Sequence, residues 1–191
     1  VNAANRDKLT RHFDLQKDDL AVKIEDQTDS TGMVAVQGPK VIDMIGEFSK
    51  EIPTLKRYTF TTKNLMILKM HVSRTGYTGE DGVEVILGAN MAEMAIKLLL
   101  KEKGGETVVK PAGLGARDTL RMEAGFCLHG NDISKDTNPY EAGLGWIVKL
   151  NAGDFVGREA LQAINEAGPE RNLVAFVAQE RGIPRHGNDL A

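Results

Sequence analysis

Apolar residues recur at two spacings along this 191-residue chain, and the two spacings predict a mixture of helices and strands. Alternation with period two is clearest over 83–87, where it puts Glu84 and Ile86 on one face and the remaining three apolar residues on the other. Shorter apolar runs predict further strands over 22–24, 33–36, 57–61, 65–72, 108–109, 146–150 and 173–177. Helical spacing with breaks at Gly and Pro predicts helices over 6–15, 39–49, 90–103, 113–124 and 158–166.

The order of these elements predicts the fold class. Strands come in meander-like groups with helices between them and no regular alternation, which favours an α+β fold with largely antiparallel sheets and flanking helices. The strands over 57–61 and 65–72 are expected to turn at Lys63-Asn64. A boundary near residue 170 is expected to separate a main domain, 1–170, from the truncated start of a second domain, 171–191. Because Val1 is not Met, we expect a piece of a longer protein.

Composition excludes several classes of function. The hydrophobic content of 41% and charged content of 27% are those of an ordinary globular protein, and the net charge of −3 with no basic block argues against nucleic acid as the main ligand. No apolar run approaches the length of a membrane span. A single cysteine, Cys127, excludes an internal disulfide and a CxxC metal site and favours a reducing, cytoplasmic compartment. The histidines lack metal-ligand spacing, so we expect no metal.

The segment 73–84 carries the clearest chemical signal. It holds three glycines, which let a backbone turn sharply and approach a ligand closely, and three acids, Glu80, Asp81 and Glu84, which make it a poor cradle for phosphate. Glu84 shares its strand face with small and apolar residues. A carboxylate there needs hydrogen-bond donors, and a ligand with two adjacent N–H groups, such as a pterin or guanidine, would supply them. A solvent-facing strand glutamate explains the pattern equally well.

The predicted helix 113–124 places Arg117 and Arg121 four residues apart on one face. Arg117 is the candidate cation for an anionic or carbonyl group, although a surface ion-pair helix is the more ordinary interpretation. Tyr77, Tyr140 and Trp146 are flat rings near Gly-rich turns, suited to sandwiching a planar heterocycle or, equally, to packing in the core. Isolated acids such as Asp118, Glu123, Asp132 and Glu141 are not distinguished by the sequence.

Four motifs in register resemble the aminomethyltransferase family, the T proteins of the glycine cleavage system. The match continues through Gln37-Gly38-Pro39 and through residues 182–187, so it covers essentially the whole chain. The four motifs are Ser73-Arg74-Thr75-Gly76-Tyr77-Thr78-Gly79-Glu80-Asp81-Gly82, Gly113-Leu114-Gly115-Ala116-Arg117-Asp118-Thr119-Leu120-Arg121, Leu128-His129-Gly130-Asn131-Asp132-Ile133 and Pro139-Tyr140-Glu141-Ala142-Gly143-Leu144-Gly145-Trp146.

The resemblance implies a three-lobed protein around a tetrahydrofolate pocket, with residues 171–191 starting a C-terminal β-barrel. It implies transfer of a methylene group from the aminomethyl-lipoyl arm of H protein to tetrahydrofolate, with release of ammonia. The family's pterin-binding glutamate matches Glu84 and its folate-contacting arginine matches Arg117, while Tyr77 and Trp146 fall on pocket-lining aromatic positions. Glu84 and Arg117 are therefore expected to share one cavity.

The same resemblance places the family's catalytic aspartate upstream of Val1, so this chain is expected to have little transferase activity by itself. Three other functions stay open at this stage. They are a folate-binding relative that assists iron–sulfur assembly, a folate-dependent demethylase or dehydrogenase lobe, and a non-enzymatic α+β interaction domain. The first of these has a cysteine-containing signature, and the corresponding segment here, 154–159, lacks cysteine.

Overall fold

The computed structural model describes residues 3–65, 68–100, 108–182 and 187–188. It divides into two compact units, residues 1–114 and 115–191. Each described helix falls short of the length or the apolar content that crossing a membrane requires.

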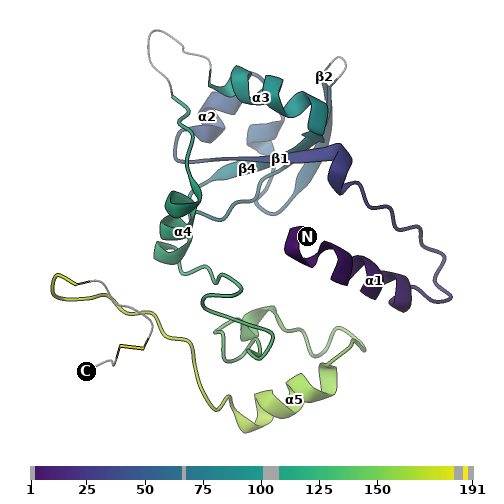
Figure 1. Cartoon of the computed structure of the whole chain (residues 1–191), viewed down its shortest axis with the longest axis vertical. Helices are drawn as coiled ribbons and strands as arrows, with labels where there is room; N and C mark the ends of the chain where they lie inside the picture. The colour runs from purple at the N-terminus through teal and green to yellow at the C-terminus, as the bar shows by residue number, and fades with distance from the viewer. Residues whose placement is uncertain (1–2, 66–67, 101–107, 183–186, 189–191) are drawn as a thin grey trace. The chain divides into compact units, whose positions relative to one another are not determined.

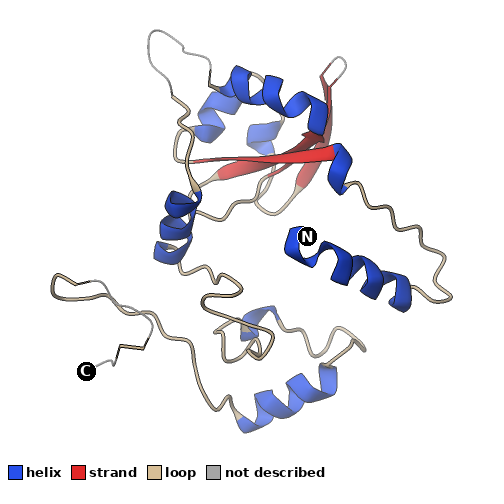
Figure 2. Cartoon of the chain, viewed as in Figure 1, coloured by secondary structure: helices blue, strands red, loops and turns tan. Residues whose placement is uncertain are grey.

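The first unit holds a four-stranded antiparallel sheet and most of the helices (Figures 1 and 2). Its strands are β1 (Thr31–Gln37), β2 (Phe60–Leu65), β3 (Leu68–Ser73) and β4 (Gly82–Gly88). Its α-helices are α1 (Arg6–Gln16), α2 (Val41–Gly46) and α3 (Ala92–Leu99), and its 3₁₀ turns are η1 (Ala3–Asn5), η2 (Thr28–Ser30), η3 (Ile52–Thr54) and η4 (Ala89–Met91).

The strands lie in the order β1-β4-β3-β2, so β4 and β3 are the two inner strands. Glu84 of β4 stands directly opposite Ala35 of β1 on one side and Ser73 of β3 on the other. Because paired residues in an antiparallel sheet project from the same face, these three side chains share a face, and the alternate residues share the opposite one.

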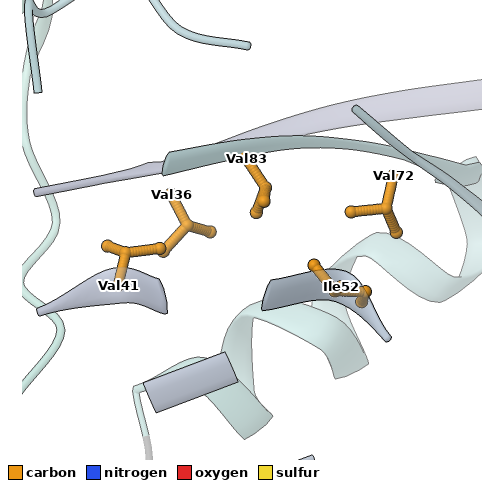
Figure 3. Packing of buried hydrophobic residues seen from close by; sticks show 5 residues of the cluster. All are labelled: Val36, Val41, Ile52, Val72 and Val83. Carbon is orange, nitrogen blue, oxygen red and sulfur yellow. The ribbon is translucent and has the colours of Figure 1, made fainter. Parts of the chain in front are cut away.

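The core lies between one face of this sheet and the helical layer. Val36, Val72 and Val83 point from the strands toward Val41 of α2 and Ile52 of η3, as Figure 3 shows. Met44, Ile45 and Leu99 pack against the edge of this cluster from the helices. The alternation predicted for 83–87 is confirmed, because Val83 and Leu87 are buried while Ile86 on the opposite face is 38% exposed.

The second unit is built mostly from loops, with α4 (Leu114–Glu123), α5 (Arg158–Ala167) and the turn η5 (Gly145–Ile147) (Figure 1). The expected helix stop at Gly168 is confirmed, since that glycine follows α5 with a φ of +81°. The backbone N–H of Leu173 donates to the carbonyl of Glu141 at 2.7 Å, so the segment after α5 returns to the loop before η5.

The α+β class, the antiparallel sheet and all five expected helices are confirmed, although α2 is shorter than expected and α3 begins two residues late. The last part of the expected helix 90–103, residues 101–103, lies outside the described residues. Four expected strands, 22–24, 108–109, 146–150 and 173–177, are wrong. None of these runs forms a β-strand among the described residues, and 145–147 forms a 3₁₀ turn. The turn predicted at Lys63-Asn64 is also wrong. Both residues lie in β2, where they pair with Met70 and Lys69 of β3. The domain boundary near 170 stays a prediction.

Candidate functional site

Glu84 lies on the face of the sheet opposite the core, here called the open face and defined by Met33, Ala35, Ser73, Glu84 and Ile86. The carboxylate is half-buried, in the middle of the sheet, beside an alanine on one strand and a serine on the other. Small neighbours leave room above it, while Met33 and Ile86 supply apolar surface along the same strands. A planar ligand lying on this face would meet one acceptor group amid apolar contacts.

The carboxylate of Glu84 is held from the loop that precedes its strand. The hydroxyl of Thr75 donates to Glu84 Oε2 at 2.5 Å. A hydroxyl–carboxylate bond of this length is at the short end of the range, so the loop holds one carboxylate oxygen firmly. Among the described residues, Thr75 donates to Oε2 and no donor reaches Oε1, so both carboxylate oxygens keep lone pairs for the N–H groups of a ligand.

Two glycines of the 73–84 loop make room for a side chain. The amide of Gln37 donates to the carbonyls of Thr75 and Val83, each at 3.1 Å. A Cβ at Gly76 would come within 1.9 Å of Gln37 Oε1, and one at Gly82 within 2.6 Å of the same atom. Among the described residues, no donor reaches Oε1, which is buried. The close approach expected from these glycines is therefore to Gln37.

Of the three acids in this loop, Asp81 is committed to an internal pair. Arg74 donates to it through Nε at 3.1 Å and Nη2 at 2.6 Å, and the backbone N–H of Gly82 donates to Oδ1 at 2.9 Å. The hydrogen bond from Arg74 lowers the pKa of Asp81, and the same bond raises the pKa of Arg74. Glu80 is exposed. Glu84 is thus the acid that the loop presents to the open face.

In the second unit, α4 carries two arginines with different surroundings. Arg121 is buried, with 4% of its side chain exposed, and it pairs with Asp118 at 2.6 Å and with Asp132. It also donates to the carbonyl of Phe126 at 3.0 Å. The hydrogen bond with Asp118 is the largest cause that raises the pKa of Arg121, the bond with Asp132 adds to it, and burial opposes both. Arg117, one turn earlier, is exposed.

The predicted site residues divide between the two units. Tyr77, which is half-buried, and Glu84 belong to one loop and the strand that follows it in the first unit. Arg117 and Trp146 belong to the second unit, where Trp146 is 73% exposed in η5. The shared cavity of Glu84 and Arg117 stays a prediction. Asp118 and Asp132 are engaged by Arg121, and Glu141 accepts from Arg171 at 3.4 Å, which leaves these acids in structural pairs.

Sequence reasoning missed two residues of this site, Thr75 and Gln37. Both lie inside matched motifs, but hydrophobic periodicity says nothing about a hydroxyl in a loop or an amide at a strand end. The available signal was the pair Gly76 and Gly82, because two glycines that flank a turn predict that something packs closely against the backbone.

Comparison with known proteins places the chain in a family. The family description "GCVT N-terminal domain" matches residues 1–152. The chain is 43% identical to an aminomethyltransferase of Halothermothrix orenii, covering 98% of this chain and 52% of that protein. It is also 43% identical to an aminomethyltransferase of Rubrobacter xylanophilus, covering 100% of this chain and 50% of that protein.

A solved structure gives the same result. The glycine cleavage system aminomethyltransferase T of Bartonella henselae superposes with a TM-score of 0.71 at 30% identity, over 88% of this chain and 45% of that one. The chain thus spans about half the length of the relatives it matches. On the match over residues 1–152, the identity to these relatives and the shared fold, the chain belongs to the aminomethyltransferase family of the glycine cleavage T proteins.

Proposed function

We propose that the protein to which this chain belongs is the aminomethyltransferase of the glycine cleavage system. In this proposal it transfers a methylene group from the aminomethyl-lipoyl arm of H protein to tetrahydrofolate. The products are ammonia, 5,10-methylenetetrahydrofolate and the dihydrolipoyl form of H protein. A single observation carries the assignment to this chain: Glu84, in a family whose members are aminomethyltransferases, presents a half-buried carboxylate on the open face.

The residues present suit a reduced pterin. Its amino group and adjacent ring N–H form a pair of donors, and a carboxylate accepts such a pair as it accepts the two N–H groups of arginine. Glu84 has one oxygen held by Thr75 and stands between Ala35 and Ser73, so a flat ring meets no large side chain on the paired strands beside it. Met33 and Ile86 offer the apolar contact that such a ring also needs.

The other proposed contacts with folate come from two aromatic residues and one arginine. Tyr77 lies in the loop before Glu84 and is the proposed aromatic neighbour of the pterin. Arg117 on α4 supplies a guanidinium, which suits an anionic or carbonyl group of folate, and exposed Trp146 supplies a second flat ring. Tetrahydrofolate, when bound, supplies the nucleophilic nitrogen that accepts the one-carbon group. The chain's own residues orient it, and orientation is a large part of such catalysis.

The test is a single-turnover assay of the full-length gene product with aminomethyl-loaded H protein and tetrahydrofolate. We expect formation of 5,10-methylenetetrahydrofolate together with ammonia. Glu84→Gln, which keeps the size of the side chain and removes its charge, is expected to weaken tetrahydrofolate binding by about tenfold to a hundredfold, because a charge-assisted bidentate contact is lost. Glu80→Gln, an exposed acid of the same loop, is the matched control and is expected to bind as the wild type does.

Absence of both transfer and tetrahydrofolate binding in the wild type would overturn the proposal. Binding without transfer from H protein would instead indicate a folate-dependent relative of another specificity. The same assay on the 191-residue chain checks the expectation that this chain has little activity by itself.

A further inference from the structure

We propose that Thr75 is a positioning residue that fixes the orientation of the Glu84 carboxylate on the open face. The inference rests on the proposed function, because it assigns to Thr75 a part in presenting Glu84 to the pterin. Thr75 acts through Glu84 and not on the ligand directly. A change at Thr75 is therefore expected to affect ligand binding only when Glu84 is present.

The contact itself is direct. Thr75 Oγ1 lies 2.5 Å from Glu84 Oε2, and this bond joins a loop residue to the middle of an inner strand nine positions later. A free glutamate side chain samples many rotamers, and ordering it on binding costs affinity. A hydroxyl that already holds one oxygen removes part of that cost and turns the second oxygen in a defined direction. Thr75 thus prepares the acceptor before a ligand arrives.

Thr75 is itself held in place by the Gln37 amide. That amide donates to the carbonyl of Thr75 and to the carbonyl of Val83, the residue before Glu84, at 3.1 Å each. One side chain therefore ties together the two backbone segments from which the hydroxyl and the carboxylate project. If these two segments moved apart, the hydrogen bonds of the Gln37 amide would lengthen. The amide therefore helps to fix the Thr75–Glu84 distance, in addition to the contact between the two side chains.

The loop around this pair is closed by further contacts. Gly76 and Gly82 admit Gln37 between them, where a Cβ would fall 1.9 Å and 2.6 Å from its Oε1. Arg74, which precedes Thr75, is joined through two hydrogen bonds to Asp81. The backbone on both sides of Thr75 is thus restrained by buried or half-buried contacts. A hydroxyl on so restrained a loop is suited to orienting its partner, whereas on a free loop it would follow the partner.

The test measures tetrahydrofolate binding by calorimetry with the full-length gene product. Thr75→Val replaces the hydroxyl with a methyl group of similar size, and we expect the Kd to rise about tenfold. Thr75→Ser keeps the hydroxyl and is expected to restore binding to within about twofold of the wild type. Thr61→Val is the matched control, since Thr61 also donates to a glutamate, Glu51 at 2.9 Å, and is expected to leave the Kd unchanged.

A double-mutant cycle separates positioning from general damage to the fold. If Thr75 acts through Glu84, then Thr75→Val should have no further effect on the Kd once Glu84→Ala is present, a change that removes the acceptor of the Thr75 hydroxyl. Additive effects in the cycle would overturn the inference, as would wild-type affinity in Thr75→Val. If Thr75→Val fails to fold, as judged by its circular dichroism, Thr75→Ala takes its place in the same cycle.

The outcomes distinguish this inference from the proposed function. No tetrahydrofolate binding by the wild type overturns the function and with it the inference. Binding by the wild type that Glu84→Gln weakens and Thr75→Val does not leaves the function standing and rejects the positioning role alone.

Discussion

Arg74 and Asp81, seven residues apart, are joined side by side through two hydrogen bonds, Nε to Oδ1 at 3.1 Å and Nη2 to Oδ2 at 2.6 Å. The remaining nitrogen of the guanidinium, Nη1, donates to the carbonyls of Pro53 and Leu55 at 3.0 and 2.6 Å. One planar group therefore connects the candidate site loop to the segment around η3. This requires the fixed fork of an arginine, which an ammonium group does not reproduce.

We expect Arg74→Lys to lower the free energy of unfolding by about 1–3 kcal/mol, because a lysine keeps the charge but cannot satisfy Asp81 and two carbonyls at once. Urea unfolding at pH 7, followed by circular dichroism, measures the change. The matched control is Lys97→Ala, which removes an exposed pair with Glu93 on α3 and should cost less than about 0.5 kcal/mol. Equal effects of the two changes would contradict the structural role of Arg74.

The Arg74–Asp81 pair also predicts a pH dependence. The pKa of Asp81 is lowered in the folded chain, so the unfolded state binds a proton at higher pH than the folded state does. The stabilisation is fully present above the unfolded pKa of about 4 and is lost as the pH falls below it. The difference in unfolding free energy between the wild type and Asp81→Asn should therefore shrink as urea titrations move from pH 6 toward pH 3. A difference that stays constant over this range would refute the lowered pKa.

The helices and strands whose apolar residues follow one regular spacing were predictable from the sequence. The strand around Glu84 alternates cleanly because one face packs against Val41 and Ile52, and the burial of that face enforces the pattern. Both ends of α5 were marked by glycines, Gly157 and Gly168, in conformations with positive φ. In such segments local chemistry and tertiary packing agree, which makes them readable without a structure.

The segments that were predicted wrongly are short apolar runs. A run such as 173–177 has strand composition, but a strand forms only where a neighbour offers hydrogen bonds, and pattern alone does not reveal the neighbour. The β2–β3 turn was displaced for a related reason. Lys63 and Asn64 have turn composition, yet they continue β2 because Met70 and Lys69 pair with them. Tertiary pairing there overrides local preference.

The strand face on which Glu84 lies was predictable from the sequence. The hydrogen-bond partners of Glu84 and of the other acids were not. Period two alone placed Glu84 on the face away from the core. Pattern reasoning could not assign Asp81 to Arg74 or Asp132 to Arg121, since each pair joins residues separated by a turn whose path the sequence does not specify. Three of the acids considered as candidates for acid–base chemistry, Asp118, Asp132 and Glu141, belong to such pairs.

We expect Gly76→Ala to destabilise the first unit by about 1–3 kcal/mol, because the new Cβ would lie 1.9 Å from Gln37 Oε1 and the amide must move. Gly32→Ala in β1 is the control, since its Cβ would meet Ala92 at an ordinary 3.6 Å. Urea unfolding compares the two. In a Gln37→Ala background the cost of Gly76→Ala should fall by more than half, and an unchanged cost there would show that the glycine is needed for another reason.

The last prediction concerns Arg121, the buried cation of the second unit. Arg121→Met keeps much of the side-chain volume but removes the shared counter-charge of Asp118 and Asp132 and the hydrogen bond to the Phe126 carbonyl. The buried guanidinium joins α4 to the loop at 126–132 through these hydrogen bonds, so their loss should lower the Tm by about 5–10 °C in calorimetry. The triple change that adds Asp118→Asn and Asp132→Asn should recover part of that loss, because the two carboxylates, which no longer share a cation, are then uncharged and do not repel each other. Glu123→Gln, exposed on the same helix, serves as the control and should shift the Tm by less than about 2 °C. If Arg121→Met unfolds at the wild-type temperature, the guanidinium does not hold α4 to the loop at 126–132.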